Sequence, residues 1–469
     1  MSTQLGDRRG RQESSEYSLA MQDALRRNLT LEEALKDEVE KNGKHDALSF
    51  PDAGVSTFRC YLSGYCQDRV IPCGTKEQLF ERWMSFRSVI STTSTNAEMQ
   101  QAAVDQDPNF PEIGIGSVGQ VFAHPGTPIC YKLPKTKDDK LQKLHNNYLM
   151  QVKVSEAFQN FAKKYPDLTL ETVLIPRPHY WAVPTDDAFW DDRIDKFEWN
   201  EIEKGRTEAL CMERIFPVPG PFRHLLIERF CPPAQQAAAK NSPKNKQCLV
   251  RIMLGGESHG KSTLGFNLRN FSMTADKLAG TTLLAPEYAL AMAGAMATLH
   301  WEAQLDGNDI EFVLGSVPTQ DQEIRQTMTY DEVKSLRAQT STFQLVTQSR
   351  ANFKQRLMCL WMLDFDSCRE IARNDDGVEQ AVKAFMDTYA YCPRPHPDKF
   401  RQDLWQTFGT EYIKVSRAIL PKDLHDLPTK FLTEIEARIK ANREAGVQTP
   451  SATPQSPWSS QSRRPGGEY

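Results

Sequence analysis

A glycine-rich segment at residues 114–121 constrains the fold of this 469-residue chain more than any other feature. It reads GIGSVGQV, a G-x-G-x-x-G pattern in which glycines let backbone amides approach a phosphate group closely. A dinucleotide-binding fold needs a helix directly after this pattern. The sequence VFAHPGTPICYKL follows instead, and it is typical of strand, turn and strand. The segment therefore predicts a glycine-rich β-hairpin with a lysine, Lys132, on the next strand.

A second phosphate-binding pattern lies at residues 255–262, where GGESHGKS fits G-x-x-x-x-G-K-[ST]. A P-loop must open a helix, so that the helix amides face the phosphates. The residues that follow alternate apolar and polar from Leu264 onward, which is strand periodicity. We interpret the segment as a hairpin turn joining Cys248–Leu254 to Leu264–Phe271, and keep a P-loop NTPase as an alternative.

Two further segments extend the pattern that begins with the hairpin. A helix predicted over 139–164 follows Lys132, and a residue of this helix is expected to face the lysine. Asn147 lies at a suitable distance but is not acidic, whereas Glu156 is acidic and lies one to two turns later. Further along, the apolar run LCME ends in Glu213, just before the proline-rich FPVPGP, which predicts a strand leading into a hinge.

The next two segments place acidic residues in loops beside apolar strands. A helix predicted over 286–302 runs into the loop that holds Asp306, and Glu311 stands five residues later, at the start of the strand-like FVLG. The apolar strand LMCLWML ends in Asp364-Phe-Asp366. Each segment alone could be a turn or a capping acid. Four signals in this order favour a shared site of lysine, glycines and carboxylates.

The remaining sequence indicates one two-lobed α+β body with extensions. We expect a polar, helical extension over 1–105, an N-lobe over 106–230, a C-lobe over 231–442 with a polar insertion at 316–355, and a disordered tail over 443–469. Within the extension, helices are expected over 17–42 and 76–90. Helices over 377–388, 401–418 and 428–443 are expected in the C-lobe.

Charge and composition exclude several classes of protein. The net charge of −4 argues against a globally basic nucleic-acid binder. The ten cysteines form no CxxC pair and the nine histidines show no zinc-ligand spacing, so we expect free thiols and no zinc. No uninterrupted apolar stretch is long enough for a membrane helix, and the first residues lack a signal-peptide core. We expect a soluble cytoplasmic or nuclear protein.

Over roughly residues 110–420 the chain resembles a family of uncharacterised fungal proteins, a domain of unknown function labelled "zinc finger protein". The resemblance is carried, in order, by ICYKLPK, VLIPRPHYW, LCMERIFPVP, CLVRIMLG, FNLRNF, ATLHWEAQLDGNDIEFVLGS, LWMLDFDSC and GVEQAVKAF. This resemblance implies kinship but brings no established activity.

More remotely, the same positions resemble the protein-kinase-like superfamily, which implies ATP bound between two lobes. The resemblance implies that Gly114, Gly116 and Gly119 cover the phosphates and that Lys132 contacts the α- and β-phosphates. It also implies that Glu213 contacts the nucleotide at the hinge and that Asp364 and Glu311 bind Mg²⁺. Asp306 would orient or deprotonate the acceptor hydroxyl.

The chain also departs from the kinase pattern. No His-Arg precedes Asp306, Glu311 stands where Asn is usual, and Asp366 replaces the glycine of Asp-Phe-Gly. We therefore expect either an ATP- and Mg²⁺-dependent phosphotransferase with an unknown small-molecule or protein acceptor, or a catalytically inactive kinase-like scaffold. In the scaffold, the insertion and the tails would bind a protein partner. Neither nucleic acid nor a membrane is an expected partner.

Overall fold

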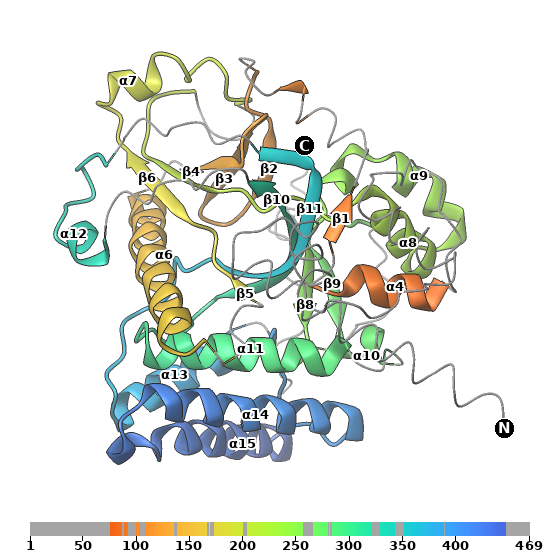
Figure 1. The fold of residues 1–469 in the computed structure, drawn as a ribbon, viewed down its shortest axis with the longest axis vertical. Helices are drawn as coiled ribbons and strands as arrows, with labels where there is room; N and C mark the ends of the chain where they lie inside the picture. The colour runs from red at the N-terminus through yellow and green to blue at the C-terminus, as the bar shows by residue number, and fades with distance from the viewer. Residues whose placement is uncertain are drawn as a thin grey trace, which may run out of the picture. The chain divides into compact units, whose positions relative to one another are not determined.

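The chain divides into two units, Met1–Tyr65 and Cys66–Tyr469. The computed structural model describes residues of the second unit only, from 76 to 446, with gaps at 87–88, 92–99, 101, 104–107, 136–137, 167, 169–172, 200–203, 257–265, 280, 282–283, 321–328, 343–350 and 389. The predicted helix over 17–42 and the tail from 447 onward lie outside the described residues. The described part is α+β, as the sequence predicts, and contains two sheets (Figure 1).

The first sheet begins with the predicted glycine-rich hairpin. Its five strands are β2 (Glu112–Ile115), β3 (Gly119–His124), β4 (Ile129–Pro134), β6 (Pro178–Ala182) and β7 (Ala209–Glu213). They lie in the order β2-β3-β4-β7-β6, and every neighbouring pair is antiparallel. The strand that carries Lys132 is therefore central in the sheet.

Apolar residues cover both faces of the first sheet. Helix α6 (Asp138–Lys164) follows β4, as predicted, and its Leu144 and Tyr148 pack with Trp181 of β6 on one face. The other face holds an aromatic cluster that includes Tyr131. Because side chains alternate along a strand, Tyr131 and Lys132 point to opposite faces. Lys132 therefore lies on the α6 side of the sheet.

The second sheet is built around a long hairpin of β10 (Glu311–Gln320) and β11 (Ala351–Leu363). Its order is β1-β11-β10-β8-β9, with β1 (Val89–Ser91), β8 (Val250–Met253) and β9 (Phe271–Thr274), while β5 (Val173–Leu174) pairs with β11. After β7 the chain reaches this sheet directly, because Phe216 exchanges two backbone hydrogen bonds with Ser316 of β10.

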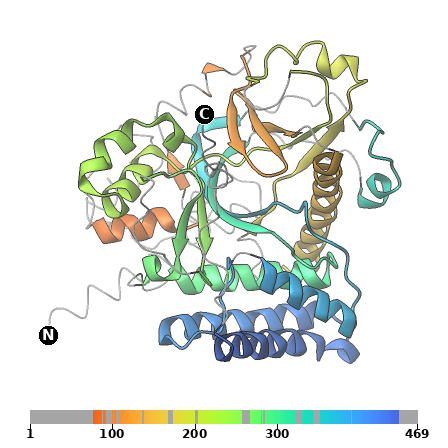
Figure 2. The same ribbon diagram turned by 180° about the vertical axis from the view of Figure 1, so that it is seen from behind.

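Helices pack beneath the second sheet. Nearly every residue of α11 (Leu284–Trp301) is buried, and α11 packs against α14 (Lys399–Ile419), as both views show (Figures 1 and 2). Helix α15 (Leu427–Glu444) lies against α14 and against α13 (Asp375–Asp387). The predictions of helices at 286–302, 377–388, 401–418 and 428–443 are confirmed.

Smaller helices complete the described part. The segment after β7 forms α8 (Gly220–Phe230), α9 (Gln236–Asn241) and the 3₁₀ turns Pro233–Gln235 and Pro243–Gln247. Two four-residue helices, α7 (Asp187–Trp190) and α10 (Ala275–Leu278), follow β6 and β9. A last 3₁₀ turn, Lys422–Leu424, precedes α15.

Two sequence predictions are wrong in detail. The predicted hairpin of Cys248–Leu254 and Leu264–Phe271 is a parallel pair, β8 and β9, and its second strand begins only at Phe271. The chain turns at Asn270, whose φ of 59° ends the extended conformation that the alternation predicts. The helix expected over 76–90 ends earlier, because α4 is Lys76–Met84 and residues 89–91 pair with β11.

The polar insertion predicted over 316–355 is shorter than expected, because β10 and β11 both extend into it. Between them lies α12 (Tyr330–Lys334), which begins with a capping box of Thr329 and Glu332. Thr342 then accepts a hydrogen bond from the backbone of Trp181 in β6 and contacts the Tyr148 hydroxyl of α6. The described part of the insertion is thus fastened to the first sheet and to α6.

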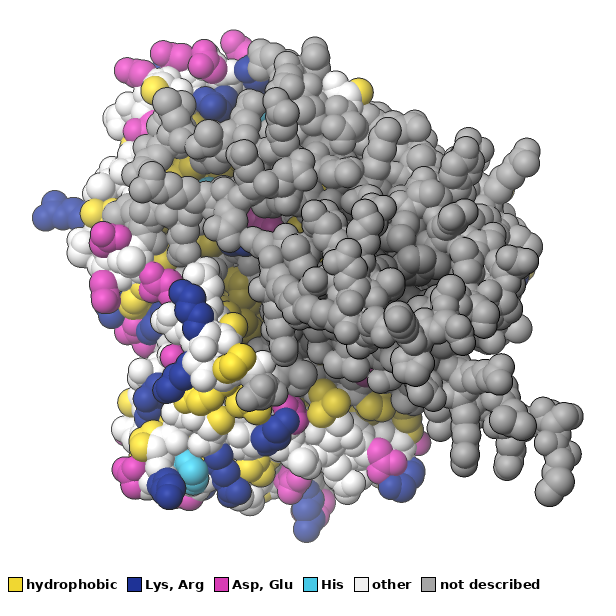
Figure 3. All heavy atoms as spheres, in the orientation of Figure 1, with side chains coloured by type: hydrophobic (Ala, Val, Ile, Leu, Met, Phe, Trp, Pro, Cys, Tyr) yellow, Lys and Arg dark blue, Asp and Glu magenta, His cyan; other side chains and the backbone are white. Residues whose placement is uncertain are grey.

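The described surface carries both positively and negatively charged side chains. Over the described residues of the face in Figure 3, lysine and arginine side chains are interspersed with acidic ones. None of the described helices is both long and apolar enough to cross a lipid bilayer.

Candidate functional site

The three glycines of the hairpin differ in what the fold requires of them. A Cβ on Gly119 would lie 2.2 Å from the carbonyl oxygen of Leu133, so the approach of β3 to β4 requires glycine there. A Cβ on Gly114 or Gly116 would meet no protein atom closer than 3.6 Å, and neither residue has a positive φ. A side chain at position 114 or 116 would therefore make only ordinary van der Waals contacts, and packing does not require glycine at either position.

The residues predicted to bind together at the centre of the site do meet. The Nζ atom of Lys132 lies 3.1 Å from Oδ1 of Asp364, although 232 residues separate them in the chain. The lysine side chain is 12% exposed and the aspartate side chain 33% exposed. Strand β4 of the first sheet and the loop after β11 of the second sheet thus share an ion pair that is partly open to solvent.

Asparagines of α6 hold the loop that carries Asp364. Asp364 has a left-handed backbone, with a φ of 68°, and the next residue, Phe365, is fully buried. The Phe365 amide donates to Oδ1 of Asn147, and Nδ2 of Asn146 donates to the carbonyl oxygens of Asp366 and Cys368. An uncommon backbone conformation is thus maintained by side chains of a remote helix.

Three further carboxylates, those of Glu311, Asp366 and Asp309, interact with this ion pair. Burial, together with the charges of Asp364 and Asp309, raises the pKa of Glu311 to about 7, although Arg251 lies 2.8 Å away and opposes the shift. Burial and the charge of Asp364 likewise raise the pKa of Asp366 to about 6. Burial is the largest cause of both shifts, and repulsion from the neighbouring carboxylates adds to it.

The central pair is charged at neutral pH. Burial acts to lower the pKa of Lys132, but Asp364, Asp366 and Glu311 outweigh it and hold the pKa above its ordinary value. Burial acts to raise the pKa of Asp364, but the charges of Lys132 and Arg251 outweigh it and hold the pKa below its ordinary value. Lysine and aspartate therefore stabilise each other in the ionised form.

Asp306, the predicted acid of the loop before β10, points into the protein. Its side chain is buried, and Oδ1 accepts hydrogen bonds from the amides of Asn308 and Arg369. Oδ2 accepts from the side chain of Gln380 in α13. Protein donors therefore occupy both carboxylate oxygens of Asp306.

The sequence analysis gave no role in the site to Asp309. Asp309 has a φ of 62° and its side chain is exposed. Partial loss of water around the carboxylate and the charge of Asp364 raise its pKa, while Lys143 of α6 and Arg251 act to lower it. The sequence did carry a signal, because Asp309 lies between Asp306 and Glu311, the two acids assigned to the site. Aspartate also tolerates the left-handed backbone conformation that the loop requires here.

The residue expected to face Lys132 from α6 has other contacts in the described structure. Asn147 binds Phe365, and Oε1 of Glu156 accepts from the amide of Tyr330 in α12. Among the described residues, the ion-pair partner of Lys132 is Asp364. The sequence carried a signal for these contacts in the two adjacent asparagines, Asn146 and Asn147, of a 27-residue helix. Asparagine is a weak helix former, so its presence within a long helix indicates that its side chain binds another segment.

Glu213 lies at the end of β7, where the hinge was predicted. Its side chain is largely buried, and Oε2 accepts from the amide of Arg177, just before β6. Burial raises its pKa. The Glu213 side chain thus joins the ends of β6 and β7, and the proline-rich segment follows it directly.

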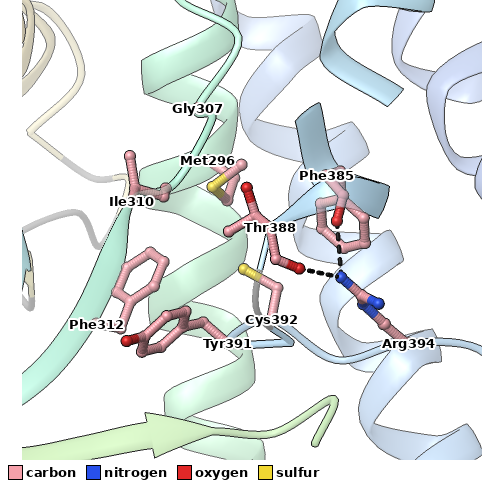
Figure 4. A pocket seen from close by; sticks show the side chains of 9 residues that line it. All are labelled: Met296, Gly307, Ile310, Phe312, Phe385, Thr388, Tyr391, Cys392 and Arg394. Atoms are coloured by element: carbon pink, nitrogen blue, oxygen red, sulfur yellow. Dashed lines mark hydrogen bonds between the residues drawn. The ribbon is translucent and has the colours of Figure 1, made fainter. Parts of the chain in front are cut away.

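A small cavity lies behind the loop that carries Asp306. It measures about 20 Å³, room for one water molecule, and is lined by Met296, Gly307, Ile310, Phe312, Phe385, Thr388, Tyr391, Cys392 and Arg394 (Figure 4). Nη2 of Arg394 donates to the carbonyl oxygens of Phe385 and Thr388, at the C-terminal end of α13. The guanidinium therefore caps that helix. None of the predicted site residues lines this cavity.

The predicted P-loop lies almost entirely outside the described residues, which resume at Phe266. From Phe266 to Asn270 the described chain is not helical. Among the described residues, no three His, Cys, Asp or Glu side chains group together as a metal site. The seven described cysteines are free and buried.

Comparison with known proteins yields one match. No curated protein and no solved structure matches the chain. A family model for a domain of unknown function, described as "Zinc finger protein", matches residues 360–424, from the end of β11 to the turn before α15. The segment that carries Asp364 and Asp366 is therefore similar to that family, in agreement with the first resemblance drawn from the sequence.

Proposed function

We propose that the protein binds a nucleoside triphosphate with Mg²⁺ at the Lys132–Asp364 pair and transfers a phosphoryl group to a hydroxyl acceptor. The observation that carries the proposal is the 3.1 Å approach of these two residues below a hairpin whose Gly114 and Gly116 are not required by packing. Lysine, glycine amides and a metal-binding acid are the parts that phosphoryl transfer needs, because positioning and charge neutralisation supply most of its catalysis.

The arrangement of the elements supports a kinase-like architecture. The glycine hairpin, the lysine on the next strand and the long helix α6 follow one another, and β7 leads into a proline-rich linker. The loops at Asp306 and Asp364 flank the β10–β11 hairpin. These are the segments, in the same order, that the kinase-like superfamily uses to hold ATP between two lobes.

The residues around the Lys132–Asp364 pair suit a nucleoside triphosphate and Mg²⁺. Lys132 would move from Asp364 to the α- and β-phosphates, and the amides near Gly114 and Gly116 would cover them. Asp364 with Glu311 would hold Mg²⁺, which commonly takes one or two carboxylates and completes its shell with phosphate and water. Asp364 acts with burial to raise the pKa of Glu311 and of Asp366, and a divalent cation would relieve the repulsion among these carboxylates. When bound, the ion would supply charge neutralisation at the phosphates.

A second candidate function is a nucleotide-binding scaffold without catalysis. The observation that favours it is the burial of Asp306, since both of its oxygens are occupied by protein donors and it does not face solvent. The fastening of the insertion to α6 and to β6 is compatible with either function.

Thermal unfolding of the purified full-length protein tests the proposal. ATP with Mg²⁺ at hundredfold excess over Kd is expected to add about 2.7 kcal/mol to the free energy of unfolding, which raises Tm by several degrees. The shift should need both ATP and Mg²⁺, and should be lost in Lys132→Met and Asp364→Asn.

Lys261→Met is the matched control, because it removes the lysine of the other phosphate-binding pattern. It is expected to keep the full shift. A shift lost only in Lys261→Met would overturn the kinase-like proposal in favour of a P-loop. The scaffold is supported if the shift is present but no phosphoryl transfer occurs.

A further inference from the structure

We propose that residues 329–342, which comprise α12 and the segment after it, form a clamp that holds α6 against the segment carrying Asp364, and that Glu370 locks this clamp. The clamp is part of the insertion between β10 and β11, and α12 lies beside α6 (Figures 1 and 2). This coupling is a property of the folded chain alone and goes beyond the proposed function, because it needs no nucleotide.

Buried contacts anchor the clamp to α6 and to the first sheet. Val333 of α12 is 1% exposed and lies in one apolar cluster with Tyr148 of α6 and Trp181 of β6. The indole Nε1 of Trp181 donates to the carbonyl oxygen of Ala338 at 3.0 Å, and its backbone amide donates to the Thr342 hydroxyl at 2.7 Å. Because these groups are buried, their hydrogen bonds are stronger than those at the surface, and this side of the clamp is the firmer one.

Glu370, in the segment after β11, is the acceptor on which α6 and α12 converge. Its Oε1 accepts from Lys153 of α6 at 2.7 Å, from Lys334 of α12 at 3.2 Å and from the Tyr330 hydroxyl. Both ammonium groups also lie over the Tyr330 ring, 4.9 and 5.4 Å from its centre. Hydrogen bonds from Lys153 and Tyr330 lower the pKa of Glu370 to about 2, so the carboxylate is ionised at neutral pH. One carboxylate thus joins three elements.

The same face of α6 holds the beginning of this segment. Asn146 donates to the carbonyl oxygens of Asp366 and Cys368 at 2.9 and 3.1 Å. Lys153 lies about two helical turns after Asn146, so both side chains leave the same face of α6. The segment from 364 to 370 is therefore held by α6 near both of its ends, and at the second end α12 holds the same carboxylate.

The lock is exposed, whereas the anchor of the clamp is buried. The side chains of Glu370 and Lys334 are 45% and 52% exposed. Ion pairs with this exposure add little to global stability, so the lock can open while the core formed by α11 and α14 stays folded. Opening would loosen the segment that carries Asp364 in its left-handed conformation. Displacement of α12 would thus act on the candidate site without touching it.

Hydrogen–deuterium exchange of the full-length protein without nucleotide, read by mass spectrometry, tests the clamp. Glu370→Gln removes the charge that binds the two lysines, and Tyr330→Phe removes the hydroxyl from the side of the clamp. In each variant the amides of residues 365–371 should exchange about fivefold faster. Exchange in α11 and α14 should stay as in wild type, and Tm should fall by no more than about 3 °C. The double variant should exchange no faster than Glu370→Gln alone, since both changes open the same lock.

Glu379→Gln is the matched control. It removes the same charge from a glutamate of α13 that is 60% exposed and pairs with Arg438 of α15, and it should leave exchange at 365–371 as in wild type. Unchanged exchange at 365–371 in both Glu370→Gln and Tyr330→Phe would overturn the proposal, because the segment would then be held without the lock. Faster exchange throughout α11 and α14 would overturn it too, since the changes would then act on global stability.

Discussion

Replacing Lys132 by methionine should destabilise the protein more than replacing Asp364 by asparagine. Methionine keeps most of the length of the side chain but removes the positive charge at 3.1 Å from Asp364. Asp364 then remains beside Asp366 and Glu311 without its main neutralising charge. Asparagine at position 364 also breaks the pair, but it removes one negative charge from an overcharged cluster.

The magnitude follows from the distance and the exposure of the pair. Two unit charges 3.1 Å apart attract by about 5 kcal/mol at an effective dielectric constant of 20. The aspartate is 33% exposed, so water weakens this attraction, and we expect a coupling free energy of about 2 kcal/mol. Lys132→Met should then cost about 3 kcal/mol, Asp364→Asn about 1 kcal/mol, and the double variant about 2 kcal/mol.

Urea unfolding followed by tryptophan fluorescence, on wild type and the three variants, measures this cycle. Equal costs for the two single variants, or a coupling below about 0.5 kcal/mol, would refute the argument that the lysine neutralises a crowded acidic cluster. An unchanged dependence on urea concentration in all four proteins is the control that the folded and unfolded states are comparable.

Three further predictions concern residues around the site. Burial lowers the pKa of His300 to about 3, so between pH 6.5 and pH 3 the unfolded chain binds a proton there that the folded protein does not, and His300 alone should reduce the free energy of unfolding by about 1.4 kcal/mol for each pH unit of acidification. His300→Phe should flatten this dependence in urea unfolding between pH 7 and 5, whereas Tyr412→Phe should keep it. Thr342→Val should cost about 2 kcal/mol in the same assay, since it removes contacts to α6 and β6; no change would mean that the insertion is not fastened there. Asn147→Ala should weaken ATP binding in calorimetry, because the Phe365 amide loses its acceptor and the loop at Asp364 is released; unchanged affinity would contradict this.

The sequence predicted the glycine-rich hairpin, most of the helices and a shared site for Lys132 and Asp364. Periodicity located α6, α11 and the C-terminal helices because each buries one continuous apolar face or is buried all round. The order of the motifs was enough to expect Lys132 and Asp364 in one site, but the partner of Lys132 was expected on the following helix, and the ion pair with Asp364 was not predicted.

The features that could not be predicted depend on contacts between remote segments. The inward orientation of Asp306 is set by Arg369 and Gln380, residues whose own positions depend on the fold. The role of Asn147 depends on a hydrogen bond to Phe365 across 218 residues. The alternation predicted a strand over Leu264–Phe271, but the strand begins only at Phe271; periodicity also carries no information on strand direction, and β9 lies parallel to β8.

The most direct test of the proposed site is a crystal structure of the protein with a non-hydrolysable ATP analogue and Mn²⁺. The account predicts an anomalous Mn²⁺ peak at coordination distance from a carboxylate oxygen of Asp364, with the triphosphate between Lys132 and the glycines at 114 and 116. Nucleotide bound at residues 255–262, or Mn²⁺ away from Asp364, would contradict it.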